Sequence, residues 1–245
     1  MNIHPVIEKL KLLKLKGFVE SLEDQLKNDA AQDLLFEERL CLLVETELMI
    51  RENNRLNTRL KKANLKQQAC LQDVDYRINR GLDKSLFLSF ENCNWIANHK
   101  NILITGPTGT GKSYLGEALV HNACLKGYIG KRVQTTRLLE SLVGAKGDNS
   151  YLKTLKEIAR YDVLLLDDFG MSTLSNENAK DFWEIVDDRY NAKSTIMVSQ
   201  LPVELWHETI GDKMIADAVL DRIVHNAYPL RLSGGSIRKQ KEEPE

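Results

Sequence analysis

An α/β fold, in which a parallel sheet is flanked by helices and preceded by an α-helical region, is predicted for this chain of 245 residues. Apolar residues recur every three or four positions over residues 5–66, which is the period of a helix. From residue 101 onward, short apolar runs alternate with helical patterns, as expected of a parallel sheet. A glycine-rich motif joins the first of these runs to the first helix. A hydrophobic content of 42% excludes a disordered or fibrous protein.

The N-terminal region, residues 1–67, is predicted to be an α-helical domain that contacts a partner or DNA. Its last helix is expected over residues 34–65, and residues 68–245 are expected to form the second domain. Small and polar residues interrupt the helical pattern at two places, Gly17 and the pair Asn28-Asp29.

The second half of this long helix is basic. Six positive charges and one acid lie within residues 51–66. Arg51, Arg55 and Arg59 recur every fourth residue, so on a helix they form a stripe that could follow a phosphate backbone. A solvated helix face without a ligand is an equal alternative.

The second domain is predicted to begin with a connector and an amphipathic helix, and then to alternate strands with helices. The first helix is expected over residues 82–95. Strands are expected over 101–105, 132–135, 163–166 and 194–199, and helices over 112–126, 137–143 and 179–190.

The glycine-rich motif is a full GxxxxGK[ST] match between a strand and a helix, which is the setting of a phosphate-binding loop. Its glycines let successive backbone N–H groups turn toward phosphate oxygens. Lys112 is expected to bind the β- and γ-phosphates of ATP, and Ser113 to bind Mg²⁺. The candidate nucleotide-binding residues are Gly106, Pro107, Thr108, Gly109, Thr110, Gly111, Lys112, Ser113 and Tyr114.

Two acids follow the apolar run over residues 163–166, as in a Walker B motif. Because the carboxyl ends of neighbouring parallel strands meet at one crevice, Asp167 is expected beside Ser113 as a second metal ligand. Asp168 is the candidate to orient or deprotonate an attacking water molecule. The alternative, a helix N-cap, is less compatible with the upstream motif.

The chain resembles the IstB-like ATP-binding proteins, which assist transposases of one group of insertion sequences. The resemblance rests on residues 106–113, 165–170, 194–202, 206–227 and 234–239, and it spans nearly the whole chain. It implies a P-loop NTPase of AAA+ type, related to DnaC-type helicase loaders. It also implies an ATPase that forms a homo-oligomer on duplex DNA, without sequence preference, and acts with a transposase.

The resemblance also implies roles for residues outside the two motifs. Gln200, at the end of its strand, is similar to a sensor of the γ-phosphate, although a buried structural amide is an alternative. Arg222 resembles an arginine finger that enters a neighbouring subunit's site, unless it pairs within its helix with Asp217 or Asp221. Arg189 is a second finger candidate.

Only 23 residues follow Arg222, so little or no C-terminal lid is expected. Arg238 could replace a sensor carried by a lid, and residues 76–82 could pack on the adenine. For DNA, the resemblance points to the region between the two motifs. The basic residues there are Lys131, Arg132, Arg137, Lys146, Lys153 and Lys156.

No segment approaches the roughly 20 apolar residues of a membrane span, and the four cysteines lack metal-binding spacing. These features predict a cytoplasmic protein without a membrane partner. A replicative helicase loader is the closest alternative function. A small-molecule kinase and an ATP-controlled binding switch with incidental turnover are further alternatives.

Overall fold

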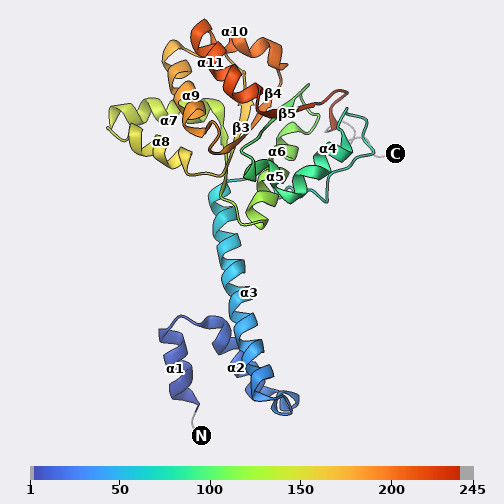
Figure 1. Cartoon of the computed structure of the whole chain (residues 1–245), viewed down its shortest axis with the longest axis vertical. Helices are drawn as coiled ribbons and strands as arrows, with labels where there is room; N and C mark the ends of the chain where they lie inside the picture. Colours follow the sequence, from blue (N-terminus) through green and yellow to red (C-terminus); the bar gives the residue numbers. More distant parts are fainter. Residues whose placement is uncertain (1–2, 238–245) are drawn as a thin grey trace. The chain divides into compact units, whose positions relative to one another are not determined.

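The computed structural model, which describes residues 3–237, divides between Thr58 and Arg59 into two compact units (Figure 1). We refer to them as the helical unit and the sheet unit. The division falls inside helix α3 (Phe36–Ala63), whereas the sequence placed a boundary beyond the end of this helix. The last turns of α3 are counted with the sheet unit because Arg59 donates to the carbonyl of Cys124 and Ala63 is fully buried.

The helical unit consists of α1 (His4–Leu12), α2 (Lys16–Lys27), a 3₁₀ turn η1 (Asp29–Gln32) and most of α3. Gly17 does not separate two helices, as predicted, but lies in the first turn of α2. A Cβ there would lie 2.4 Å from the Cα of Glu47, so glycine allows α2 and α3 to approach closely. The buried Glu47 carboxylate accepts the Gly17 N–H at 2.7 Å.

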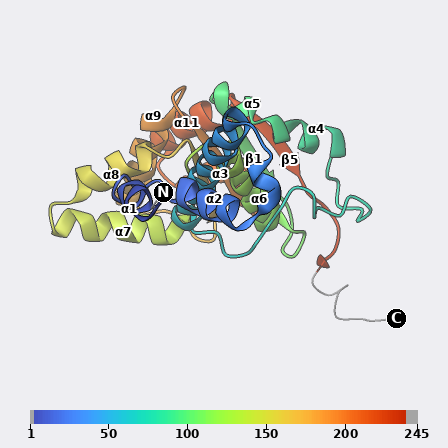
Figure 2. The ribbon, with the colours of Figure 1, turned by 90° about the horizontal axis from the view of Figure 1, so that it is seen from below.

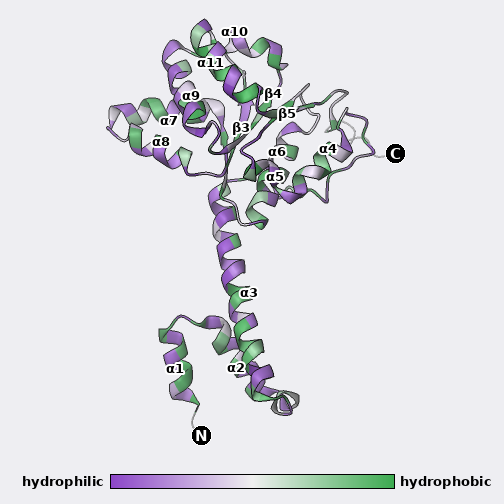
Figure 3. Ribbon diagram, in the orientation of Figure 1, coloured by the Kyte–Doolittle hydropathy of each residue, from purple (hydrophilic) through white to green (hydrophobic). Residues whose placement is uncertain are grey.

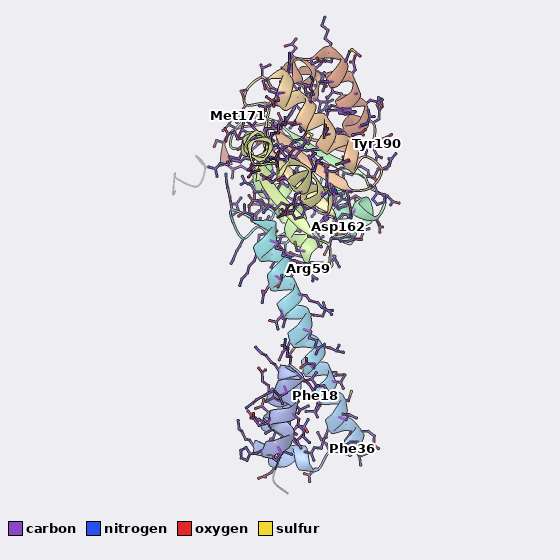
Figure 4. All side chains as sticks on the ribbon, turned by 90° about the vertical axis from the view of Figure 1, so that its left-hand side faces the viewer. Phe18, Phe36, Arg59, Asp162, Met171 and Tyr190 are labelled. Carbon is purple, nitrogen blue, oxygen red and sulfur yellow. The ribbon has the colours of Figure 1, made fainter. Side chains whose placement is uncertain are left out.

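Large apolar side chains of the helical unit are exposed. Figure 3 shows hydrophobic residues in the first half of α3 and mostly hydrophilic residues in its second half. Phe36, labelled in Figure 4, is 73% exposed at the start of this helix. The other exposed apolar residues of this part are Leu34, Leu35, Leu40, Leu42, Val44, Leu48 and Met49. We call these eight residues the exposed apolar group of the helical unit.

The helix predicted over residues 82–95 is divided into three short pieces. These are α4 (Lys84–Ser89), η2 (Phe90–Asn92) and α5 (Asn94–Ala97). Cys93 adopts a left-handed conformation with φ 58°, which ends one helix and starts the next. Burial of Phe87, Phe90 and Trp95 holds the three pieces on the sheet unit.

Five parallel strands form the sheet, in the order β2-β3-β4-β1-β5. The predicted strands β1 (Asn101–Thr105) and β4 (Ser194–Ser199) are confirmed at both ends. β2 (Gly130–Gln134) and β3 (Val163–Phe169) are also confirmed, with shifted ends. β5 (Ala227–Arg231) was not predicted; it pairs with β1 at the edge of the sheet, where its proline is tolerated.

Helices cover both faces of the sheet, as predicted. α6 (Lys112–Leu125) packs on one face, where Gly116 meets Leu165 and Val198. The opposite face is covered by α7 (Thr135–Gly147), α9 (Asn176–Arg189) and α11 (Lys213–Val224), whose side chains share a core with Leu103, Leu164, Leu166 and Met197. The shorter elements are α8 (Tyr151–Ala159), η3 (Val203–Leu205) and α10 (Trp206–Ile210).

After β5, the described residues 232–237 contain no lid domain. Arg238, the proposed substitute for a sensor on a lid, lies outside the described residues. No helix within residues 3–237 combines the length and the apolar character needed to cross a membrane.

Candidate nucleotide site

The loop between β1 and α6 is shaped by glycines in conformations that other residues rarely adopt. Gly106 has φ 143° and Gly109 has φ 86°. A Cβ on Gly106 would lie 2.3 Å from the carbonyl oxygen of Leu232, and one on Gly109 would lie 2.3 Å from Oγ of Ser236. The loop therefore requires glycine both for its backbone and for its contact with the segment after β5.

Lys112 begins α6 and is almost completely buried. Its Nζ donates to the carbonyl of Pro107 at 2.8 Å, which folds the side chain back over the loop. Burial lowers the pKa of the Lys112 ammonium, while the charges of Asp168 and Asp167 act in the opposite direction. A buried cation at a helix N-terminus is a suitable binding group for a phosphate anion.

The structure brings the two candidate metal ligands together. Oγ of Ser113 donates to Oδ1 of Asp167 at 2.8 Å, and Asp167 is 1% exposed. Hydroxyl and carboxylate oxygens are ligands that Mg²⁺ prefers in sites that also bind phosphates. The residues at this edge of the sheet thus fit a Mg²⁺ ion with ATP.

Sequence reasoning missed the partner that neutralises Asp167. Arg132, predicted to contact DNA, is 4% exposed, and its NH2 group lies 2.5 Å from Oδ2 of Asp167. Its Nε lies 3.4 Å from the carboxylate of Glu117, which is fully buried in α6. The prediction for Arg132 was therefore wrong, because pairing of β2 with β3 brings this side chain into the interior beside the acids.

Asp168 lies where the ladder between β3 and β4 shifts register, and it has φ 58°. This backbone conformation interrupts the alternation of side chains between the two faces of the strand. Strained backbone of this kind is typical of functional positions. Nε2 of Gln134 donates to Oδ2 of Asp168 at 3.0 Å. Gln134, a residue absent from the sequence-based predictions, thereby fixes the orientation of the candidate catalytic carboxylate.

Gln200 follows β4 and is exposed, so the alternative of a buried structural amide is wrong. Its Oε1 accepts the hydroxyl of Thr108 at 2.7 Å, and its Nε2 lies 3.4 Å from the sulfur of Met171, labelled in Figure 4. The amide thus lies beside the phosphate-binding loop and has no apolar enclosure.

The two arginine finger candidates differ sharply. Arg222 on α11 pairs with Asp187 of α9 at 2.8 Å and lies over the ring of Tyr190, and its side chain is 27% exposed. Its partner is therefore neither Asp217 nor Asp221, as the intrahelical alternative required.

Arg189 is 2% exposed and cannot act as a finger. It donates to the hydroxyl of Thr195 and to the carbonyls of Ile158, Tyr161 and Ser194. Burial lowers the pKa of its guanidinium to about 9. Arg189 therefore joins α8, α9 and β4 as a structural residue, which corrects the sequence-based prediction.

Tyr76, the first residue of the segment 76–82, and Tyr114 both contact other protein groups. The ring of Tyr76 packs edge-on against Phe87, with centroids 6.5 Å apart. The hydroxyl of Tyr114 donates to the carbonyl of Cys70 at 3.5 Å. Packing of Tyr76 on the adenine is therefore not favoured by its position.

Several basic residues proposed for DNA contact are engaged by protein groups. On α3, Arg51 pairs with Glu47 and Arg55 with Glu52. Lys146 pairs with Glu177 and Asp181, and Lys131 donates to the carbonyl of Lys62. Arg137, Lys153 and Lys156 are exposed and form no ion pair with a described residue.

The buried charge cluster predicts a large effect on stability. Arg132→Met should lower the free energy of unfolding of the nucleotide-free protein by about 3–5 kcal/mol, since Asp167 and Glu117 are left buried without a counter-ion. Urea denaturation would measure this loss of stability. Arg137→Met, which replaces an exposed arginine, is the control and should change the free energy of unfolding by less than about 0.5 kcal/mol.

The same variant has a defined pH dependence. Burial raises the pKa of Glu117 in the folded protein, and the charge of Arg132 opposes this rise. A carboxyl whose folded pKa exceeds its unfolded pKa destabilises the fold as pH rises above the unfolded value. The loss of stability in Arg132→Met should therefore be greatest at neutral pH and shrink as pH falls toward 5. A loss of stability that is small, or that does not depend on pH, would contradict the role of Arg132 as the counter-ion of Asp167 and Glu117.

Comparison with known proteins gives a consistent result. Residues 8–244 match the family described as IstB-like ATP binding protein. The insertion sequence ATP-binding protein y4pL of Sinorhizobium fredii is 41% identical over 241 residues, covering 98% of each chain. The ATP-binding protein of insertion sequence IS1162 from Pseudomonas fluorescens is 43% identical over 203 residues, covering 82% of this chain and 88% of the relative.

Solved structures share the fold of the sheet unit. A crystal structure of DnaI has a TM-score of 0.57 at 24% identity, covering 67% of this chain and 91% of that one. The DnaC helicase loader has a TM-score of 0.52 at 23% identity, covering 60% of this chain and 86% of that one. The prediction of an AAA+ P-loop fold is confirmed by these likenesses.

Proposed function

The chain belongs to the IstB-like ATP-binding family, and from this premise we propose that it is an ATPase that oligomerises on duplex DNA and assists a transposase in selecting or preparing its target. One observation carries the ATPase part of this proposal. The Ser113 hydroxyl lies 2.8 Å from the carboxylate of Asp167, the residue that precedes Asp168 in the sequence. Both groups lie at the edge of the sheet where β1 and β3 end. This arrangement supports a metal site for phosphoryl transfer, with Asp168 next to it as the candidate to orient water.

Each residue of the site has a distinct role in this proposal. Ser113 and Asp167 would hold Mg²⁺, which neutralises negative charge on the phosphates when it is bound. Lys112 would exchange the Pro107 carbonyl for phosphate oxygens. Asp168, held by Gln134, would orient the attacking water and accept its proton.

Two further residues would respond to the γ-phosphate. Gln200 is hydrogen-bonded to Thr108 of the loop, so its amide is in place to sense a ligand bound there. Arg222 would enter the site of a neighbouring subunit and stabilise charge in the transition state. Its pair with Asp187 is partly exposed, so this pair could be exchanged for a phosphate at a subunit interface.

The DNA part of the proposal depends on local charge. Positive and negative residues nearly cancel, 34 against 35, so a net attraction to DNA is not expected. Arg137, Lys153 and Lys156 are exposed and form no ion pair within residues 3–237. Together with the lysines at the end of α3, they supply cations for phosphate contacts without sequence preference.

The partner part of the proposal rests on the helical unit, within the region 1–67 that we assign to partner or DNA interaction. The exposed apolar group of this unit consists of eight large side chains, and exposed apolar residues concentrated in one region are common at protein interaction sites. The names of the relatives connect them with insertion sequences, which supports a transposase as the partner.

Binding to random-sequence duplex DNA with ATP, with ADP and without nucleotide, at fixed salt, tests the proposal. We expect tight binding with ATP only. Lys112→Ala should bind ATP about ten- to a hundred-fold more weakly, because a charge-assisted contact is lost, and should not bind DNA in response to ATP.

Lys126→Ala is the matched control, because it removes an exposed lysine at the other end of α6. It should behave as the unaltered protein. DNA binding that is absent, or that is equal with and without ATP, would overturn the proposal.

A further inference from the structure

A second buried cation lies beside the phosphate-binding loop. Arg80, in the connector before α4, is 5% exposed. Its NH1 group donates to the carbonyl of Thr110 at 3.3 Å, and a Cβ on Gly111 would lie 2.7 Å from the same group. The guanidinium therefore contacts the loop immediately before Lys112.

The hydrogen bonds of Arg80 are incomplete. Its NH2 group donates to the carbonyl of Asp75 at 3.3 Å, and its Nε is buried without a hydrogen-bond partner among residues 3–237. Arg189 is equally buried, but there every nitrogen of the guanidinium donates to an oxygen at 2.5–3.1 Å. Arg80 thus lacks the complete set of acceptors that a purely structural arginine has in the same protein.

Arg80 also forms no ion pair within the part of the chain that the structure describes. Among residues 3–237, no carboxylate forms an ion pair with Arg80, and the nearby Asp75 carboxylate instead binds Arg77 at 3.0 Å. Burial lowers the pKa of the Arg80 guanidinium, and the charge of Asp75 opposes this effect in part. A buried charge without a partner is costly, so a site that retains one is suited to an anion that completes it.

The backbone around Arg80 is fixed by the segment after β5. Ser233 donates its N–H to the carbonyl of Arg80 at 2.9 Å, and Ile237 donates its N–H to the carbonyl of Gly109 at 2.9 Å. Figure 2 shows the connector and this segment side by side. The segment after β5 therefore contacts both Arg80 and the phosphate-binding loop.

We propose that Arg80 is a nucleotide-binding residue, whose guanidinium interacts with the phosphates held by the GxxxxGK[ST] loop. The inference rests on the proposed ATP-binding function and adds to it a phosphate contact from outside the motif. It also gives a reason for the buried and incompletely satisfied guanidinium. Phosphates are the anions that this loop is built to bind, and arginine binds them through several N–H groups at once.

Calorimetric binding of ATP and ADP to the full chain tests this role. Arg80→Gln should weaken both affinities by about tenfold or more, as expected for the loss of a charge-assisted contact. Arg80→Lys, which keeps the charge, should lose less. Arg77→Gln is the matched control, because Arg77 lies in the same segment with a side chain that is 91% exposed, and it should change affinity less than about twofold.

Thermal unfolding separates this role from a structural one. In the nucleotide-free protein, Arg80→Gln should have an unchanged or higher Tm, since an uncompensated buried charge is removed, and its rise in Tm on adding ATP should be smaller. A lower Tm without nucleotide, with an ATP affinity equal to that of Arg77→Gln, would overturn the inference. If the unaltered protein binds no ATP, the proposed function itself is wrong. If the unaltered protein and Arg80→Gln bind ATP equally well while Lys112→Ala does not bind it, only the role of Arg80 is wrong.

Discussion

Asp168→Asn is expected to lower the rate of ATP hydrolysis by about 10³-fold and to leave ATP affinity within about twofold of its original value. The carboxylate lies beside the proposed metal ligand Asp167 on a strained backbone, and Gln134 donates to it at 3.0 Å. An amide of the same size keeps the geometry but cannot accept a proton from water. The loss should therefore fall on kcat alone.

The rate of phosphate release at saturating ATP would measure the loss in kcat, and a separate binding measurement would check that ATP affinity is unchanged. Asp188→Asn removes an exposed carboxylate from α9 and serves as the control, with an expected rate near that of the unaltered protein. If Asp168→Asn keeps more than a tenth of the rate, the catalytic role of Asp168 is wrong. A loss of ATP affinity would point to the nucleotide pocket instead of the attacking water.

Arg222→Ala should lower hydrolysis by about 10³-fold at saturating ATP, which is the effect of removing an arginine that stabilises transition-state charge. If Arg222 acts as proposed, in the site of a neighbouring subunit, mixing Arg222→Ala with Asp168→Asn should restore part of the activity. In such a mixture, an intact Arg222 of one subunit meets an intact Asp168 of another.

Asp187→Ala provides the matched control, since it breaks the same ion pair from the other side. Its activity should remain within about twofold of the original, because surface ion pairs contribute little to stability. Two outcomes would contradict the finger. These are an equal loss in Asp187→Ala, and a mixture that is no more active than its two components.

The fold was predictable wherever burial acted on short runs of sequence. β1 and β4 are apolar on both faces, so their limits follow from the sequence. β5 was missed because it is largely exposed and contains a proline. The helix over 82–95 was predicted as continuous because nothing in the sequence marks Cys93 as left-handed.

The site was predictable where a motif fixes local chemistry, and not where tertiary pairing does. The phosphate-binding loop and the two acids of β3 could be predicted from the spacing of residues in their motifs. The structure places Ser113 of the loop in contact with Asp167. Arg132 and Gln134 reach Asp167 and Asp168 only because β2 pairs with β3 in one register, which places Gln134 opposite Asp167. A lone arginine in the sequence is normally assigned to the surface, so its burial was not foreseeable.

The position of β5 restricts how copies of this protein can associate. Leu232 donates its N–H to Thr105 of β1, so by the two-residue period of a strand the nitrogen of Pro229 faces the outer edge. A proline nitrogen carries no hydrogen, and the outer edge of β5 therefore lacks a donor at its centre. Arg231, which pairs with Glu204 of η3 at 2.9 Å, adds a charged side chain to the same strand. Strand addition at β5 is thereby disfavoured, so two copies that met across this edge would not form a continuous intermolecular sheet.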